Sequence, residues 1–146
     1  MFMLRPATSL DIDALSAIDR LAQTDRRRRE FITRSVAHGT CSVADAPSGQ
    51  AAGYGVLDYA FFDNGFVSMI YVAPANRRQG AGLLLLRHLE SLCQTPKLFT
   101  STNLSNLPMQ ALLAKAGYRL SGVIHDLDEG DPELIYVKYL GKASLP

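Results

Sequence analysis

The stretch that decides the fold is Tyr71-Val72-Ala73-Pro74-Ala75-Asn76-Arg77-Arg78-Gln79-Gly80-Ala81-Gly82, which continues into four leucines at positions 83–86. The apolar residues before Pro74 are typical of a β-strand, and the leucines are typical of a helix. Pro74 and the two glycines mark the loop between them. Because the first N–H groups of a helix lack intrahelical partners and lie at the positive end of its dipole, such a loop predicts a seat for a phosphate or pyrophosphate.

Two nucleotide-binding patterns are excluded at this loop. No Lys-Ser/Thr pair follows the glycines, and Gly80-Ala81-Gly82 runs into leucines instead of supplying a third glycine. Arg77 and Arg78 place permanent positive charge beside the predicted seat. The alternative is an ordinary tight turn that binds nothing.

The rest of the chain predicts one domain over residues 1–146. Asp63-Asn64-Gly65 indicates a hairpin turn, because Asn and Gly tolerate positive φ angles. The predicted helices run from about Ser9, and over Asp25–Ala37, Ala81–Gln94 and Ser105–Ala116. The predicted strands are Phe2–Ala7, Thr40–Ala44, Ala51–Phe62, Phe66–Val72, Lys97–Thr102, Tyr118–Ile124 and Leu134–Leu140. This order predicts an α/β fold, with a mixed, mostly antiparallel sheet and helices on both faces.

The order Arg-x-x-Gly-x-Gly at 77–82 resembles the pyrophosphate loop of the GCN5-related N-acetyltransferase (GNAT) family. A second resemblance lies in Asn106, Ala111, Lys115 and Gly117-Tyr118, and the element order matches the GNAT fold. The likeness covers nearly the whole chain, and the segment 127–134 is similar to that of a bacterial branch of the family. It implies an acetyl-CoA-dependent N-acetyltransferase that acts on a primary amine of a small molecule or peptide.

The resemblance also implies which residues hold acetyl-CoA as co-substrate. The backbone of Ile70, Tyr71 and Val72 would bind the cofactor arm, and an N–H there would stabilise the oxyanion. The Asn106 side chain would contact the pantetheine; its alternative role is a helix cap. The pyrophosphate would bind to Arg77, Arg78, Gln79, Gly80, Ala81 and Gly82.

The catalytic groups are less directly indicated. Many relatives carry a glutamate on or near the strand before the loop, which this strand lacks. The remaining acids are Asp58, Asp63 and the acidic segment 126–133. The resemblance implies that the last hairpin borders the acceptor pocket, so Asp128 and Glu133 of this segment are the candidate general bases. The segment's carboxylates would favour a cationic amine; the alternative is a solvated turn. Leu113 stands where many relatives have a tyrosine that protonates the leaving thiolate. Tyr118, Tyr71 or a water would substitute, although packing roles also fit both tyrosines.

Four consecutive arginines at 26–29 point around a whole helical turn and so cannot all face one ligand. Most of them fit a solvated face. The resemblance implies that the first two helices flank the acceptor site, so one or two of these arginines would lie at its mouth. Their positive charge would then oppose the preference for cationic amines that the acidic segment predicts.

Composition and residue spacing limit the classes of binding partner that we expect. A net charge of +1, with 47% hydrophobic and 20% charged residues, argues against a nucleic-acid or membrane partner. His38, His88 and His125 have no metal-ligand spacing with Cys41 and Cys93, so no metal is expected. We expect a cytoplasmic protein and leave open whether it is a homodimer. The rival to an enzyme is a non-catalytic module that binds or senses acyl-CoA.

Overall fold

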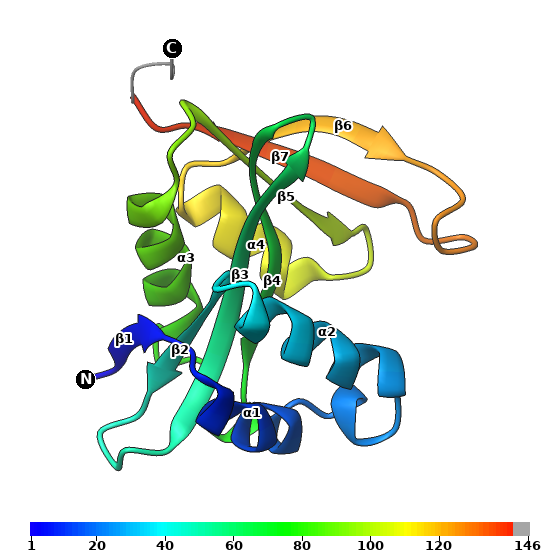
Figure 1. The fold of residues 1–146 in the computed structure, drawn as a ribbon. Helices are drawn as coiled ribbons and strands as arrows, with labels where there is room; N and C mark the ends of the chain where they lie inside the picture. Colours follow the sequence, from blue (N-terminus) through cyan, green and yellow to red (C-terminus); the bar gives the residue numbers. More distant parts are fainter. Residues whose placement is uncertain (142–146) are drawn as a thin grey trace. The chain divides into compact units, whose positions relative to one another are not determined.

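The structure is a computed structural model that describes residues 1–141, and Figure 1 shows its seven β-strands and four α-helices. The strands are hydrogen-bonded in the order β1-β2-β3-β4-β5-β7-β6. The helices are α1 (Ile12–Ile18), α2 (Arg26–Ala37), α3 (Ala81–Leu92) and α4 (Leu107–Lys115). The strands are β1 (Met3–Pro6), β2 (Cys41–Asp45), β3 (Ala51–Phe61), β4 (Asn64–Val72), β5 (Lys97–Asn103), β6 (Arg119–Ile124) and β7 (Glu133–Tyr139). A seven-stranded sheet flanked by helices confirms the predicted α/β fold class.

The described chain divides into two compact units. The first comprises Met1–Leu57 and Met69–Ser91, and the second comprises Asp58–Ser68 and the described residues from Leu92 onward. Strands β3 and β4 each contribute residues to both units.

In the first unit, helices pack on opposite sides of β3. Tyr54 and Val56 belong to a buried cluster with Leu15 of α1 and Ile32 of α2, and Figure 1 shows these two helices, in blue and light blue, side by side. Gly53 faces the other way, because a Cβ there would lie 3.3 Å from Leu85 Cδ1 of α3 and 2.5 Å from the Tyr71 carbonyl oxygen. Glycine therefore allows β4 and α3 to approach β3 closely.

The second unit is built around β5 and β7. These strands pair antiparallel along their whole length, β7 pairs antiparallel with β6, and Gly65–Val67 of β4 pair parallel with Leu98–Thr100 of β5. The buried Thr100 hydroxyl donates to the Val67 carbonyl at 2.8 Å. Phe61 packs against Phe66 and Phe99, with ring centroids 5.2 and 5.0 Å away.

The predicted hairpin between β3 and β4 is confirmed, but its turn lies earlier than Asp63-Asn64-Gly65. The two turn residues are Phe62 and Asp63, whose φ angles are 52° and 62°. Gly65 lies within β4 instead, where an added Cβ would collide with the Cys93 sulfur and lie 3.1 Å from Thr95 Oγ1. Packing against Cys93 therefore requires glycine at position 65 within β4. The turn is formed by Phe62 and Asp63 instead.

The first predicted helix is divided. A 3-10 turn at Ser9–Asp11 precedes α1, and a second 3-10 turn covers Leu21–Gln23. The break lies at Asp19, whose backbone is extended (φ −86°, ψ 109°). Asp19 Oδ1 accepts from the N–H groups of Leu21 and Ala22 at 3.1 and 3.4 Å. This local bonding competes with continuation of the helix.

Candidate functional site

The loop after β4 closes onto the strand through Arg77. The Ala73 N–H first donates to the Ala52 carbonyl at 2.7 Å, and the 3-10 turn Pro74–Asn76 follows. The Nε of Arg77 then donates to the Val72 carbonyl at 2.9 Å. Its guanidinium carbon lies 5.5 Å from the centroid of the Tyr71 ring, a cation–π distance. Arg77 thus braces the loop.

The remainder of the loop presents backbone outward. Arg78 and Gly80 both have left-handed φ angles, 62° and 86°. The Gly80 carbonyl accepts from the Leu84 N–H at 3.1 Å, so the N–H groups of Ala81, Gly82 and residue 83 lie at the open end of α3. Among the described residues, no atom lies within 4 Å of a Cβ built on Gly80, and the first turn of α3 has no acidic side chain. The loop is therefore an open cradle suited to an anion.

The second half of β4 directs alternate backbone groups to its two edges. The Tyr71 carbonyl faces Gly53 of β3, and the Ala73 N–H bonds to Ala52 of the same strand. In an extended strand, the N–H and C=O of the neighbouring residues point to the opposite edge. Those of Ile70 and Val72 therefore face away from β3, in the direction needed to bind an extended ligand along the strand.

A buried polar network lies on the α1–α2 side of the same segment. The Tyr54 hydroxyl donates to Asp19 Oδ2 at 2.6 Å, and Arg28 Nη1 donates to the same oxygen at 3.1 Å. The carboxylate of Asp19 is wholly buried. Burial, followed by the hydrogen bond to Asp19, raises the pKa of Tyr54 far above its usual range. Tyr71 joins this side of the site, since its hydroxyl accepts from the Arg20 N–H at 3.1 Å.

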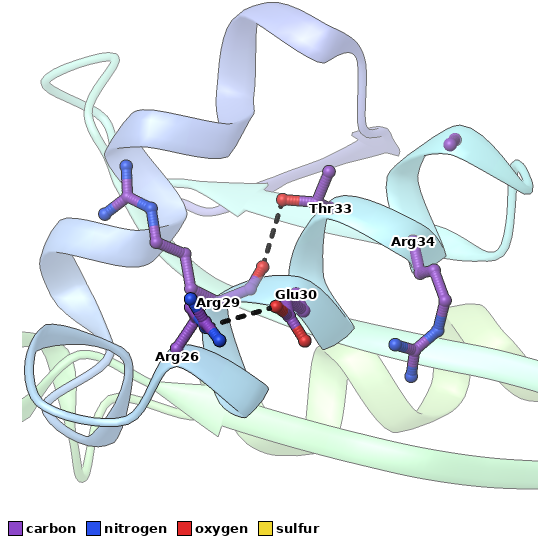
Figure 2. Close-up of a pocket in the computed structure, with 6 residues that line it drawn as sticks. Arg26, Arg29, Glu30, Thr33 and Arg34 are labelled. Carbon is purple, nitrogen blue, oxygen red and sulfur yellow. Dashed lines mark hydrogen bonds and ion pairs between the residues drawn. The ribbon is translucent and has the colours of Figure 1, made fainter.

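The arginine run confirms that four neighbouring side chains cannot share one face. Arg26 and Arg27 are about nine-tenths exposed (89% and 90%), Arg29 is 51% exposed, and Arg28 is only 20% exposed. Figure 2 shows the outer face of α2, where Arg26 pairs with Glu30 at 3.5 Å. A hollow of about 540 Å³ lies here, lined by Arg26, Arg29, Glu30, Thr33, Arg34 and Ala37. Because all its lining residues belong to one helix, it is a shallow surface and not a cleft.

The second unit contains the other residues that the sequence indicated. Asn106 caps α4, because its side-chain oxygen accepts from the Met109 N–H at 3.2 Å. Leu113 is completely buried, as a packing residue would be. Tyr118 is also buried, with the Lys138 ammonium 5.6 Å from its ring centroid.

The acidic segment is tied to the end of β5. Asp128 Oδ2 accepts from the Asn103 amide at 2.9 Å, and the Asp131 carboxylate accepts from the backbone N–H and the hydroxyl of Ser105 at 3.0 and 2.6 Å. Glu133 is partly buried at the start of β7, opposite Asn103 and Ile124. Two of the five carboxylates therefore hold the turn in place.

Comparison with known proteins identifies the family. The model of the acetyltransferase (GNAT) family matches residues 10–118. The chain belongs to the GNAT family. It is similar to a GNAT acetyltransferase from Bacillus cereus ATCC 10987, with 35% identity, a TM-score of 0.89, and coverage of 98% of this chain and 99% of that one. Curated protein sequences give no match.

More distant structures share the GNAT fold. The ribosomal-protein-S18-alanine N-acetyltransferase from Escherichia coli has 19% identity and a TM-score of 0.79, with coverage of 99% and 97% of the two chains. Ard1 from Thermoplasma volcanium has 16% identity and a TM-score of 0.80, with coverage of 94% and 97%. These likenesses confirm the fold that the loop and element order predicted.

Two further findings concern the described residues of this GNAT chain. In residues 1–141, no helix is long and apolar enough to cross a membrane. The same residues contain no group of three or more His, Cys, Asp or Glu side chains placed to hold a metal ion.

Sequence reasoning missed the network of Asp19, Arg28 and Tyr54 in this GNAT protein. The arginine run indicated that one or two arginines would face inward, without indicating which. Asp19 follows the apolar face of α1 and is nine residues from Arg28. The one available signal was an aspartate next to a predicted apolar helix face. An exposed aspartate at the end of a helix would give the same pattern.

Proposed function

We propose that this GNAT protein is an acetyl-CoA-dependent N-acetyltransferase that acetylates a primary amine of a small molecule or peptide. The observation that carries the proposal is the continuous backbone surface from β4 to α3. Ile70 and Val72 direct N–H and C=O groups away from β3, and the open cradle at Arg78–Gly80 follows within the same unit. The thioester supplies an activated acetyl group; the protein's task is to align it with the amine.

The cofactor-binding residues divide by the group they would hold. The N–H groups of Gln79, Gly80, Ala81 and Gly82 would bind the pyrophosphate, and Arg78 would add charge at the exposed rim. Arg77 would act mainly by bracing the loop through Val72. The backbone of Ile70–Val72 would bind the pantetheine arm and stabilise the oxyanion. Asn106 would contribute its amide N–H₂, since its side-chain oxygen already caps α4.

The acceptor amine must lose a proton before it attacks. An alkyl amine of pKa about 10.4 is almost wholly protonated at pH 7, so a base, direct or through water, accelerates the reaction. We propose Asp128 and Glu133 as the candidate bases. Glu133 is the stronger candidate, because an oxygen of Asp128 is already committed to Asn103.

Departure of the thiolate does not depend on the tyrosine that Leu113 replaces. A thiol of pKa about 8.5 is a moderate leaving group. Tyr71 can donate a proton, since its hydroxyl oxygen accepts from Arg20 and its O–H remains a donor. Water or Tyr118 would be the alternatives.

A non-catalytic acyl-CoA-binding module is the second candidate, and the buried Leu113 in the usual position of the acid favours it. We also propose a cytoplasmic location, because Cys41 is buried as a reduced thiol, as is usual in reducing compartments.

Thiol release from acetyl-CoA, measured with a panel of amines and confirmed by mass spectrometry of the acetylated product, tests the function. Amine-dependent turnover is expected. Tight coenzyme A binding without turnover of any amine would favour the sensing module.

A further inference from the structure

The Asp19 carboxylate in the ion pair with Arg28 is buried and fully hydrogen-bonded, and a gain in stability alone does not explain this arrangement. Asp19 is wholly buried, and four donors satisfy its carboxylate: Tyr54, Arg28 and the backbone N–H groups of Leu21 and Ala22. Burying such a pair costs desolvation that its attraction scarcely repays. The Asp19 carboxylate does, however, hold the Arg28 guanidinium in one position.

Only one edge of that guanidinium is occupied. Arg28 Nη1 donates to Asp19 Oδ2 at 3.1 Å and approaches Met69 Sδ at 3.3 Å. A guanidinium has five N–H donors in a planar fork. Within residues 1–141, its Nε and Nη2 donors have no acceptor, and the side chain keeps 20% of its surface exposed. Arg28 is therefore anchored at one edge and open at the other.

The Arg28 guanidinium lies beside the strand where we place the cofactor arm, since its Nη1 is 3.3 Å from Met69 Sδ. Met69 directly precedes Ile70, and both Met69 and Tyr71 pack against the cluster of α1, α2 and β3 side chains. Residues two apart on a strand share a face, so the Tyr71 hydroxyl lies on the same side of β4 as Arg28. That hydroxyl accepts from Arg20 and keeps its proton as a donor.

We infer that Arg28 binds a carboxylate of the acceptor and that the substrate is a small amine that carries a carboxylate. This inference rests on the proposed function and names its acceptor class. A guanidinium fork matches the two oxygens of a carboxylate. Because Asp19 already fixes Arg28, little side-chain entropy is lost when the substrate binds.

This conclusion favours one of two opposing expectations from the sequence. The acidic segment 126–133 suggested a preference for cationic amines. Two of its carboxylates, Asp128 and Asp131, hold the turn, whereas Arg28 is fixed and partly open. The inference therefore follows Arg28, which would bind the carboxylate of a zwitterionic amine and leave its ammonium available for deprotonation.

The test compares amino acids with their carboxamides, which keep the amine and remove the negative charge. The wild-type protein is expected to have a kcat/KM at least about tenfold higher for the acids, as one charge-assisted hydrogen bond provides. Arg28→Lys retains a cation for Asp19 but removes the fork, so it is expected to abolish this preference through KM for the acids. Rates with the carboxamides should change less than about threefold.

Three controls make the result decisive. Arg27→Lys changes the neighbouring, 90% exposed arginine and should leave the preference unchanged. Thermal unfolding and coenzyme A titration show whether Arg28→Lys remains folded and binds cofactor. Calorimetric titration of the amino acid into the protein–coenzyme A complex reads acceptor binding without turnover.

The outcomes separate the two proposals. Amino-acid binding that disappears in Arg28→Lys supports the inference even if no amine is acetylated, in which case only the proposed function fails. Equal kcat/KM for acids and carboxamides in an active wild-type enzyme, or unchanged preference in Arg28→Lys, overturns the inference. Absence of amino-acid binding in an inactive wild-type protein also overturns it.

Discussion

The Tyr54 hydroxyl donates a 2.6 Å hydrogen bond to Asp19, 35 residues earlier in the chain, and thereby joins the centre of β3 to the segment that follows α1. The same carboxylate holds Arg28. Tyr54 is wholly buried, so the carboxylate that loses this donor cannot recruit bulk water in its place.

We therefore expect Tyr54→Phe to lower the free energy of unfolding by about 1–3 kcal/mol, the usual cost of a buried polar group left without its partner. Urea unfolding measures this. Tyr139→Phe, which changes a 59% exposed tyrosine, is the control and should have little effect. A Tyr54→Phe protein as stable as the wild type would mean that the Tyr54 hydrogen bond contributes nothing to the network.

The second prediction concerns the cradle at Gly80. Gly80→Ala should weaken coenzyme A binding at least about tenfold, because the new methyl group would occupy the space of the pyrophosphate. The substitution also strains a residue with φ of 86°. Gly49→Ala is a matched control, since Gly49 has φ of 87° and, like Gly80, no neighbouring atom within 4 Å of an added Cβ.

Both variants should lose about 1 kcal/mol of stability from backbone strain, and only Gly80→Ala should lose affinity in calorimetric titration with coenzyme A. Equal affinity in the two variants would remove the phosphate-binding role from the loop.

Features that depend only on neighbouring residues in the chain could be predicted from the sequence. The strand, Pro74 and Gly80 define a turn and a helix start wherever the chain is placed, so the loop was predictable. The turn at Phe62–Asp63 was not, because Asn64-Gly65 is the better local signal and the need for Gly65 comes from Cys93, 28 positions later in the sequence. Arg28 could not be singled out for the same reason: its inward position depends on Asp19 and Tyr54, which no periodicity connects.

The third prediction concerns acid stability. Arg5 donates to Asp11 at 2.8 and 2.9 Å, and this hydrogen bonding, strengthened by Thr8, lowers the pKa of Asp11 to about 2. A lowered folded-state pKa gives stability that is complete above about pH 4 and lost as the pH falls through about 2. The exposure of Arg5 reduces the contribution to about 1–2 kcal/mol.

Asp11→Asn should therefore destabilise the protein by that amount at pH 7 and progressively less between pH 4 and pH 2. Urea unfolding over this pH range measures the difference. Asp13→Asn, at a 94% exposed carboxylate, should be nearly silent. A destabilisation by Asp11→Asn that stays constant from pH 7 to pH 2 would contradict the linkage to Arg5.

The last prediction distinguishes the two candidate bases. Glu133→Gln should lower kcat about 100-fold and leave coenzyme A affinity unchanged, because general-base catalysis typically contributes 10²–10⁴-fold. Asp128→Asn should have a smaller effect, since Asp128 accepts a hydrogen bond from Asn103 and serves the turn. Glu129→Gln, at an exposed position of the same segment, is the control.

A pH profile of kcat provides a second measurement. The wild-type rate should rise with pH as the general base loses its proton, and Glu133→Gln should lack this rise. Because the deprotonated amine reacts faster, a higher pH should partly restore the variant. If Glu133→Gln and Glu129→Gln have the same kcat and the same profile, Glu133 is not the base; a large loss in Asp128→Asn alone would assign the role to Asp128.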